Sequence, residues 1–229
     1  MSAAPLPTPE TLPPFREILR RCPQQRFDVI LDVGANIGQS SLTFAMAFPN
    51  ADIWGFEPAE DSFRAFSAAA RNFPRLRAGQ VAFSSEPGTL RMIMHGTTTR
   101  NRITDRPIAD NIKEVQVHRL DSWCAANGIA HVDFLKVDTE GHDLEVLKGA
   151  TGLLPQVDFV QVEVSMNRYN RFHVHFSEVE EFMSAAGFYL FWIHGMAFEG
   201  RNYPVMRRAD PIFVNSRVVG PMTGVITER

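Results

Sequence analysis

Short apolar runs alternate along the chain, from Phe27 onward, with longer segments whose apolar residues repeat at helical spacing. Runs rich in β-branched residues are typical of strands buried on both faces of a parallel sheet. The predicted strands of this sheet lie at 28–33, 53–56, 80–83 and 157–164, with another that starts at Val132. The predicted helices lie at 39–48 and 60–72, with a third running from Leu144 to Pro155. This alternation predicts an α/β fold with helices on both faces of one sheet.

Other segments fit the alternation less well. Further extended segments are predicted at 89–94, 115–120, 188–193 and 211–214. The last two are expected to form a closing antiparallel hairpin. Residues 96–111 are polar and poorly periodic, and a loop of this length is often functional, so it is a candidate lid. Ser177 and Glu180 have the spacing of a capping box, which predicts a helix start.

The size of the chain favours one domain. Its 229 residues, 45% of them hydrophobic, are enough for a single sizeable core. Prolines at 5, 7, 9, 13 and 14 remove backbone donors, so residues 1–14 are expected to form an extended arm. The remaining residues, 15–229, are expected to form one α/β domain.

Charge and cysteine content narrow the partners and the compartment. The 23 basic and 26 acidic residues give a net charge of −3 without a basic block, so nucleic acid is not an expected partner. Cys22 and Cys124 show no metal-type spacing and indicate no disulfide framework. No apolar run has the length of a membrane span, and no signal-peptide pattern is present. We therefore expect a cytoplasmic protein without a membrane span.

The most informative stretch joins the first strand to the first long helix. Asp32 ends the apolar run, and Gly34 and Gly38 allow the backbone to turn sharply and to approach a ligand. The free N–H groups of the helix from Gln39 face the same place. A dinucleotide fingerprint needs glycine at the first, third and sixth positions, but the third and sixth are Asn36 and Gln39. The spacing instead resembles motif I of S-adenosylmethionine (SAM) methyltransferases, with a plain turn that binds nothing as the alternative.

A second acid follows the neighbouring predicted strand. Glu57 comes directly after the strand at 53–56, and Asp32 lies near the end of the first strand. Ligands of doubly wound sheets bind outside the carboxyl ends of the strands. A carboxylate there can accept both ribose hydroxyls of an adenosine, through bonds of about 1.5 to 3 kcal/mol each. An adenosine cofactor is therefore predicted, with SAM favoured over NAD. The alternative for Glu57 is an exposed acid at a strand end.

Further motifs extend the resemblance. The order of Asp32–Gly38, Phe56–Pro58, Leu120–Ser122, Asp133–Gly141 and Leu147–Ala150 is similar to that of the FkbM family of SAM-dependent methyltransferases. The resemblance implies a Rossmann-like class I methyltransferase fold, with a seven-stranded, mostly parallel sheet and an antiparallel C-terminal hairpin. It also implies O-methylation of a small molecule or sugar. The residues implied to bind SAM are Asp32, Gly34, Ala35, Asn36, Gly38, Gln39, Glu57, Pro58, Phe83, Ser84 and Asp138.

Methyl transfer to a hydroxyl needs alignment of the acceptor and a base for its proton. The candidate bases are Asp138, Glu140 and His142, and Glu163 is the neighbour expected to couple to them. Catechol-type methyltransferases hold Mg²⁺ with acids at comparable strand ends, which here would be Asp138 and Glu163. In those enzymes a third ligand directly follows the second acid. Val164 stands there, so no metal site is predicted.

The acceptor is not evident from the sequence. Residues 167–175 combine aromatic, cationic and amide side chains that are able to bind sugar hydroxyls, or they form a solvated loop. An NAD-dependent oxidoreductase and a non-catalytic module with a nucleotide-binding fold are the competing interpretations. Binding of NADH without SAM would favour the first, and binding of neither SAM nor its demethylated product would favour the second.

Overall fold

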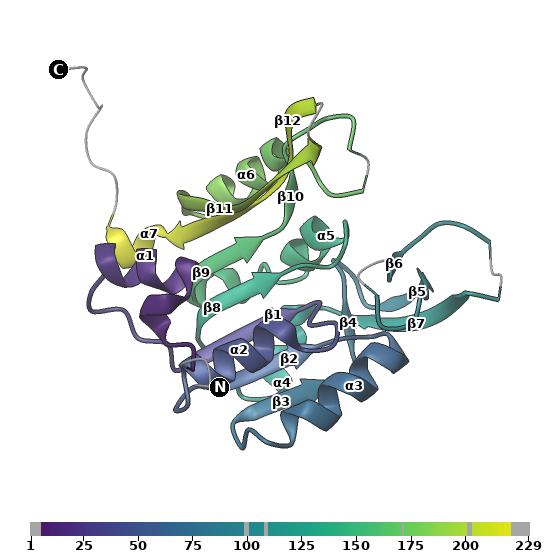
Figure 1. Ribbon diagram of the computed structural model, residues 1–229, viewed down its shortest axis with the longest axis horizontal. Coiled ribbons are helices and arrows are strands. Elements are labelled where there is room, and N and C mark those ends of the chain that lie inside the picture. Colours follow the sequence, from purple (N-terminus) through teal and green to yellow (C-terminus); the bar gives the residue numbers. More distant parts are fainter. Residues whose placement is uncertain (1–5, 99–100, 108–109, 171, 201–202, 221–229) are drawn as a thin grey trace, which may run out of the picture.

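Two β-sheets form the framework of the protein (Figure 1). The computed structural model describes residues 6–98, 101–107, 110–170, 172–200 and 203–220. Within these residues, the main sheet consists of β1 (Val29–Val33), β2 (Asp52–Phe56), β3 (Leu76–Gly79), β8 (Val132–Val137), β9 (Val157–Val162), β10 (Val164–Ser165), β11 (Phe188–Gly200) and β12 (Tyr203–Asn215). Strands β3, β2, β1, β8 and β9 are parallel neighbours in that order. Strand β12 runs antiparallel to β9 and β11, which confirms the predicted mixed sheet.

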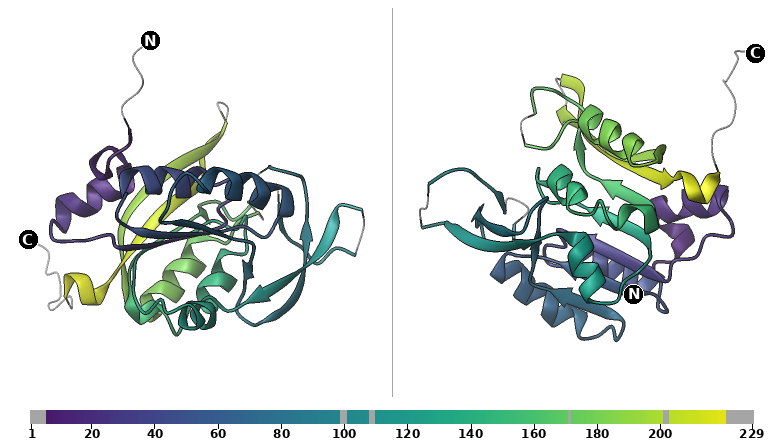
Figure 2. Two further views of the ribbon diagram at one scale, coloured as in Figure 1. Left: turned by 90° about the horizontal axis from the view of Figure 1, so that it is seen from below. Right: turned by 180° about the vertical axis from the view of Figure 1, so that it is seen from behind.

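Three helices cover each face of the main sheet (Figure 2). One face carries α1 (Pro13–Arg21), α2 (Gln39–Ala47) and α3 (Glu60–Ala70), and the other carries α4 (Leu120–Ala126), α5 (Asp143–Lys148) and α6 (Phe176–Ala185). The shorter elements are η1 (Pro9–Thr11), η2 (Leu154–Gln156) and α7 (Ser216–Val219). Every residue of β8 is buried, and its side chains alternate between the faces, so that Phe134 and Leu135 join opposite cores. The apolar run therefore marks the centre of the sheet.

The smaller sheet was not predicted. It contains β4 (Ala82–Phe83), β5 (Gly88–Ile93), β6 (Arg102–Ile103) and β7 (Ile112–His118), in the order β4-β7-β5-β6. The strand predicted at 80–83 is wrong as the third strand of the main sheet, because β3 takes that place and Phe83 belongs to β4. Strand β3 was not recognised because it ends in Gly79, which lies against the ring of Phe56, and a glycine does not continue the apolar pattern of a strand. The segments near 89–94 and 115–120 are paired as β5 and β7, and β6 lies within the predicted loop.

Two helix ends differ from the predictions. Helix α5 ends at Lys148 instead of continuing to Pro155, and Gly149 follows it against the carbonyl oxygen of Ser84, where a Cβ would overlap that oxygen. Helix α6 is capped by the ring of His175, which accepts a hydrogen bond from the N–H of Ser177 at 3.2 Å. The predicted capping box is therefore wrong.

Both ends of the chain contain more regular structure than the sequence predicted. The arm expected at residues 1–14 changes to η1 at Pro9 and to α1 at Pro13, where a proline fits the first turn of a helix; residues 1–5 lie outside the described part. The C-terminal hairpin is longer than predicted, since β11 and β12 have 13 residues each. Register shifts such as that between Leu190 and Trp192 interrupt its alternation and explain why the pattern hid its length.

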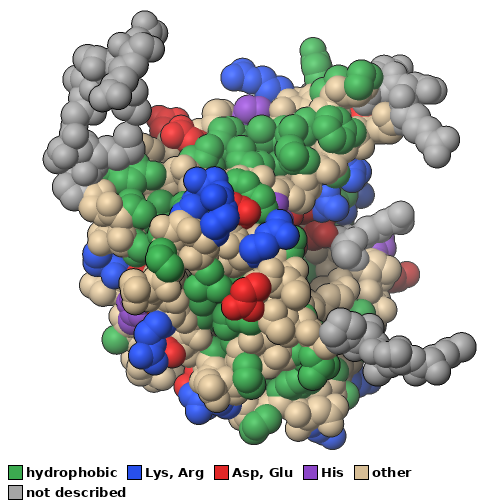
Figure 3. All heavy atoms as spheres, turned by 60° about the vertical axis from the view of Figure 1, so that its left-hand side comes forward, with side chains coloured by type: hydrophobic (Ala, Val, Ile, Leu, Met, Phe, Trp, Pro, Cys, Tyr) green, Lys and Arg blue, Asp and Glu red, His purple; other side chains and the backbone are tan. Residues whose placement is uncertain are grey.

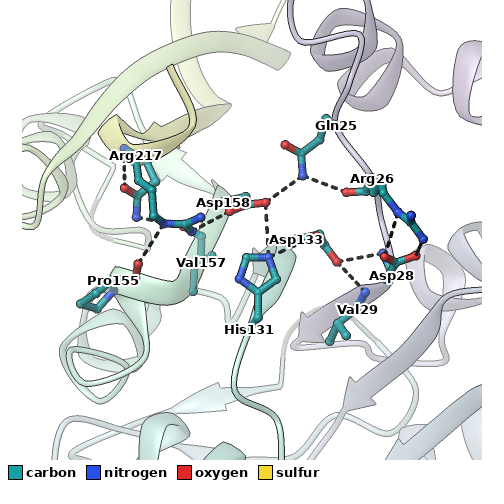
Figure 4. Close-up of polar contacts among 11 residues, drawn as sticks. Gln25, Arg26, Asp28, Val29, His131, Asp133, Pro155, Val157, Asp158 and Arg217 are labelled. Atoms are coloured by element: carbon teal, nitrogen blue, oxygen red, sulfur yellow. Dashed lines mark hydrogen bonds and ion pairs between the residues drawn. The ribbon is translucent and has the colours of Figure 1, made fainter. Parts of the chain in front are cut away.

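A polar cluster lies at the edge of the main sheet where the parallel strands β1, β8 and β9 begin (Figure 4). Asp133 Oδ2 accepts two backbone N–H groups at the start of β1, at 2.7 and 2.8 Å. His131 Nε2 lies 3.2 Å from Asp133 Oδ1 and 3.4 Å from Asp158 Oδ2. Asp158 also accepts hydrogen bonds from Arg217 at 2.6 Å and from Gln25 at 2.8 Å. The cluster thus ties α7 and the chain before β1 to the ends of β8 and β9.

The surface carries charges of both signs. On the face drawn in Figure 3, basic and acidic side chains lie scattered among hydrophobic and polar ones. The hairpin exposes apolar side chains, and those of Met196 and Phe198 are more than half exposed. In the described residues, no helix is both long enough and apolar enough to cross a lipid bilayer.

Candidate functional site

A pocket of about 230 Å³ lies at the carboxyl ends of β1, β2 and β8. Its walls come from the β1–α2 turn, from the end of β2, from β4 and β5, and from the loop that follows β8. Asn101 and Ile103, which belong to the predicted lid region, also line it. The pocket therefore lies where α/β sheets bind their ligands.

The β1–α2 turn forms one wall through its backbone. Gly34, Asn36 and Gly38 all have positive φ angles, of +87°, +50° and +89°. A Cβ at Gly34 would overlap the carbonyl oxygen of Asp138, and one at Gly38 would overlap the ring of Phe66. Asn36 is the one of these three residues that is not glycine, and asparagine adopts positive φ angles less easily than glycine does. Its side chain accepts a hydrogen bond from Ser62 Oγ at 2.9 Å. The turn is thus fixed from both sides, close to the end of β8.

Glu57 is held in one orientation at the end of β2. Its Oε2 accepts the N–H of Asn36 at 2.9 Å, and its Oε1 accepts the N–H of Ala59 at 2.8 Å. The residue is only 5% exposed. Burial, with a smaller contribution from the charge of Asp32, raises the pKa of Glu57 to about 7, against the two backbone donors that lower it. Each carboxylate oxygen keeps acceptor capacity for a further hydrogen bond.

A buried lysine connects the ends of β1 and β8. Lys136 Nζ lies 3.3 Å from Asp32 Oδ1 and 3.0 Å from Asp138 Oδ2. Burial by itself lowers the pKa of Lys136, but the two carboxylates outweigh burial and raise the pKa above its ordinary value. Asp32 is fully buried and also accepts a hydrogen bond from Ser41 Oγ at 2.6 Å. Asp32 is thus a structural partner beneath the turn, while Asp138 reaches the pocket.

The loop after β8 is bent by Asp143. Its carboxylate accepts the N–H of Thr139 at 2.7 Å and that of Gly141 at 3.0 Å. This bend places Glu140 in the left-handed region, with a φ of +54°, which costs energy for a residue other than glycine. Burial, together with the charges of Asp138 and Asp143, raises the pKa of Glu140 to about 7, against Arg208 and Arg102, which lower it. Glu140 therefore has a strained backbone conformation, and its carboxylate belongs to the pocket wall.

His142 lies at the other end of this loop. Its Nε2 is 2.9 Å from Ser84 Oγ, and burial lowers its pKa, so the imidazole is neutral near pH 7. Ser84 itself does not line the pocket; it positions His142.

A buried group of side chains lies beyond Glu140. Glu163, which follows β9, is 4% exposed, and its Oε1 contacts the guanidinium of Arg208 on β12. Its Oε2 lies 3.2 Å from His173 Nδ1. One ligand atom each from Glu140, Glu163 and His173 lies within 4.8 Å of the others. Of the acids after β8, Glu140 is thus the one that this cluster brings within 4.8 Å of Glu163.

Comparison with known proteins identifies the family. Residues 32–190 match the model of the methyltransferase FkbM domain, which is well over half of the chain. The chain belongs to the FkbM methyltransferase family. The match includes both the glycine turn and the loop after β8, so the pocket lies within the family's domain.

Two curated FkbM relatives carry more specific names. The hexuronic acid methyltransferase AglP of Haloferax volcanii is 30% identical over 151 residues, which are 60% of this chain and 56% of that protein. The 2-O-methyltransferase NoeI of Sinorhizobium fredii is 26% identical over 158 residues, which are 60% of this chain and 63% of that protein. The chain thus spans about three fifths of the length of these relatives.

A solved structure supports the fold of this FkbM protein. An uncharacterized protein from Listeria monocytogenes serotype 4b aligns with a TM-score of 0.50 and 11% identity, covering 87% of this chain and 65% of that chain. At this identity the likeness concerns the fold alone.

The pocket of the FkbM domain brings together most of the residues predicted from the sequence. Its walls include Gly34, Ala35, Asn36, Gln39, Glu57, Pro58, Phe83, Asp138, Glu140 and His142. Asp32, Gly38 and Ser84 lie behind the wall and support it. Two residues of the adjoining cluster were missed, His173 and Arg208. His173 falls in a segment considered only for sugar binding, and no sequence feature singled out Arg208.

Proposed function

We propose that this protein is a SAM-dependent O-methyltransferase that acts on a hydroxyl of a sugar or another small molecule. The observation that carries the proposal is the pocket in which the β1–α2 turn and Glu57 face Asp138 across the ends of three parallel strands. Membership in the FkbM family supports the methyl transfer. The names of the relatives AglP and NoeI support a sugar hydroxyl as the acceptor.

The residues around the pocket fit SAM. The turn at Gly34 has no room for a side chain on the side of Asp138, so its backbone stays open to a ligand on the other side. Glu57 would hold the ribose hydroxyls with the acceptor capacity left on its carboxylate. Phe83 and Ala82 would offer an apolar surface to the adenine. SAM, when bound, supplies a methyl group that is already activated for transfer.

The acceptor side of the pocket is formed by the loop after β8. Asp138 lines the pocket and holds Lys136 with Oδ2, and its carboxylate has acceptor capacity for a further proton donor. We assign the removal of the acceptor proton to Asp138. Glu140 and His142 line the same side and would contact the acceptor. Holding the acceptor oxygen in line with the methyl group contributes on the order of 7 to 11 kcal/mol to such a reaction.

Calorimetric titration tests this proposal. SAM and S-adenosylhomocysteine are expected to bind with a stoichiometry of one, and NADH is expected not to bind. Binding of NADH without SAM would replace the proposal with an oxidoreductase. Binding of none of the three would indicate a module without cofactor.

The acceptor class needs a second experiment. Incubation with SAM carrying a labelled methyl group and a panel of hexuronic acids, neutral hexoses and phenols is expected to label a sugar hydroxyl. Exclusive labelling of a nitrogen or carbon atom would contradict O-methylation.

A further inference from the structure

We propose that Glu140, Glu163 and His173 form a binding site for one divalent transition-metal ion at the acceptor side of the pocket. Binding of the ion is independent of the proposed function, but the role that we give to it rests on that function. The three residues come from the loop after β8, the end of β9 and the segment before α6, which are far apart in the sequence.

One pair of the ligand atoms already has the spacing that such an ion requires, and the third atom lies close by. All three lie within 4.8 Å of one another, and Glu163 Oε2 is 3.2 Å from His173 Nδ1. Two ligands at about 2.1 Å from a common ion lie roughly 3.0 to 3.4 Å apart, depending on the coordination angle. The pair of Glu163 and His173 is therefore already at the distance of neighbouring ligands.

Two of these ligand atoms are unsatisfied in the described structure. Glu163 Oε2 and His173 Nδ1 are buried, and neither has a hydrogen-bond partner among the described residues. The whole residue Glu163 is only 4% exposed. Buried polar atoms are almost always satisfied, and these two atoms, 3.2 Å apart, need a proton or a cation between them. An ion at this point satisfies both atoms at once.

The surrounding residues hold the three ligands in place. Arg208 binds the other oxygen of Glu163, as outer partners of metal-binding carboxylates do. Gly141 packs so closely on the carbonyl oxygen of Phe172 that a Cβ there would overlap it, which joins the loop of Glu140 to the segment of His173. The ring of Phe172 lies 4.3 Å from the guanidinium carbon of Arg102 on β6. The site is therefore built from packed segments.

A second cluster in the same protein shows what a satisfied group of the same types looks like. His131, Asp133 and Asp158 also have ligand atoms within 4.8 Å of one another. Their carboxylates, however, bind backbone N–H groups, Gln25 and Arg217 (Figure 4). That cluster has a structural use and provides a matched control.

The donor set indicates the class of ion. Two carboxylates and one imidazole suit Mn²⁺, Fe²⁺ or Zn²⁺, whereas Mg²⁺ and Ca²⁺ prefer oxygen ligands alone. Glu140 lines the pocket, so an ion bound to it would lie at the pocket wall. Its charge would favour loss of the acceptor's hydroxyl proton to Asp138 while the new O–C bond forms and the S–C bond of the donor breaks.

The test uses Mn²⁺ as the probe on the full chain, freed of metal with EDTA and then dialysed. Electron paramagnetic resonance of the free ion is expected to show one tight Mn²⁺ site per chain, which Zn²⁺ displaces. Glu163→Gln and His173→Gln are each expected to weaken this binding roughly tenfold or more. His131→Gln, in the control cluster, is expected to leave it unchanged. Binding of S-adenosylhomocysteine, measured on every variant, shows that the variants are folded.

Absence of a tight Mn²⁺ site in the unaltered protein would overturn the proposal, and so would undiminished binding in both Glu163→Gln and His173→Gln. Loss of binding only in His131→Gln would place the ion at the other cluster and would also overturn it. SAM binding without Mn²⁺ binding refutes the metal site alone, whereas Mn²⁺ binding without SAM binding refutes the proposed function alone.

Discussion

Replacing Glu57 with glutamine tests the proposed cofactor site most directly. Each oxygen of Glu57 accepts one backbone N–H, from Asn36 at 2.9 Å and from Ala59 at 2.8 Å, which fixes the plane of the group. Glutamine keeps this shape but loses the charge, and its NH₂ group faces one of the two N–H donors. Hydrogen bonds to a charged acceptor contribute about 1.5 to 3 kcal/mol each. Loss of one such bond to the ribose therefore weakens SAM binding by about 10- to 150-fold.

The pH dependence of binding gives the same prediction a second readout. Burial raises the pKa of Glu57 to about 7 in the free protein. The protonated form lacks the charge that binds the ribose, so the affinity for SAM falls as the pH drops below 7, by about 10- to 150-fold in total, and is constant above it. The folded protein prefers the protonated form, so Glu57 contributes less to stability as the pH rises from 4.5 to 7. Cofactor binding and stability thus change in opposite directions with pH.

The assay is calorimetric titration of SAM into the unaltered protein, Glu57→Gln and Glu178→Gln over pH 5.5 to 8. Glu178 is an exposed acid of α6 that does not line the pocket, and it serves as the control. Ionisation of SAM itself affects all three titrations equally and cancels in the comparison. The reasoning is refuted if Glu57→Gln binds SAM as tightly as the unaltered protein does, or if its affinity shows the same pH dependence.

Three further substitutions test the acceptor side, the turn and the amino-terminal edge. Asp138→Asn is expected to reduce the rate of methyl transfer about 10²- to 10⁴-fold while the Kd for SAM changes little, and an unchanged rate would rule out its role as the base. Gly34→Ala is expected to abolish SAM binding and to lower the Tm more than Gly128→Ala does, since both have positive φ but only Gly34 would overlap a neighbour. Asp133→Ala leaves two partly buried N–H groups without their acceptor and is expected to lower the free energy of unfolding by about 1 to 3 kcal/mol in a urea titration. Equal Tm values for the two glycine variants, or an unchanged urea midpoint, would contradict these expectations.

The parts of the fold that the sequence predicted well are those set by local chemistry. The run Val132–Val137 is buried at every position, so its composition alone marks a central strand. Gly34 and Gly38 predicted a turn with positive φ because no other residue adopts it as easily. Glu57 was recognisable because it follows a strand directly, and parallel strands place their carboxyl ends at one edge.

The parts that the sequence did not predict depend on contacts between distant segments. Strand β3 is missing from the apolar pattern because Gly79 must fit against Phe56, a requirement that only the packed sheet imposes. The cap of α6 is His175 and not Ser177, because the helix starts at Phe176 and Ser177, inside its first turn, donates its own N–H to the ring of His175. Pairing of β5 with β7 bridges a polar segment, so neither strand alone indicated a second sheet.

The same reasoning explains why the metal site was predicted as absent. The third ligand expected from the sequence pattern directly follows Glu163, and Val164 at that position is fully buried in the core. The register of β12 on β9 continues unchanged past Glu163, since Gln161 faces Ile212 and Val164 faces Ala209. Glu163 therefore keeps the position that this register gives it. Its side chain contacts His173, which lies in the segment that follows β10. A ligand that comes from a later segment has no fixed sequence spacing from the acids. Only the folded structure shows that it lies beside them.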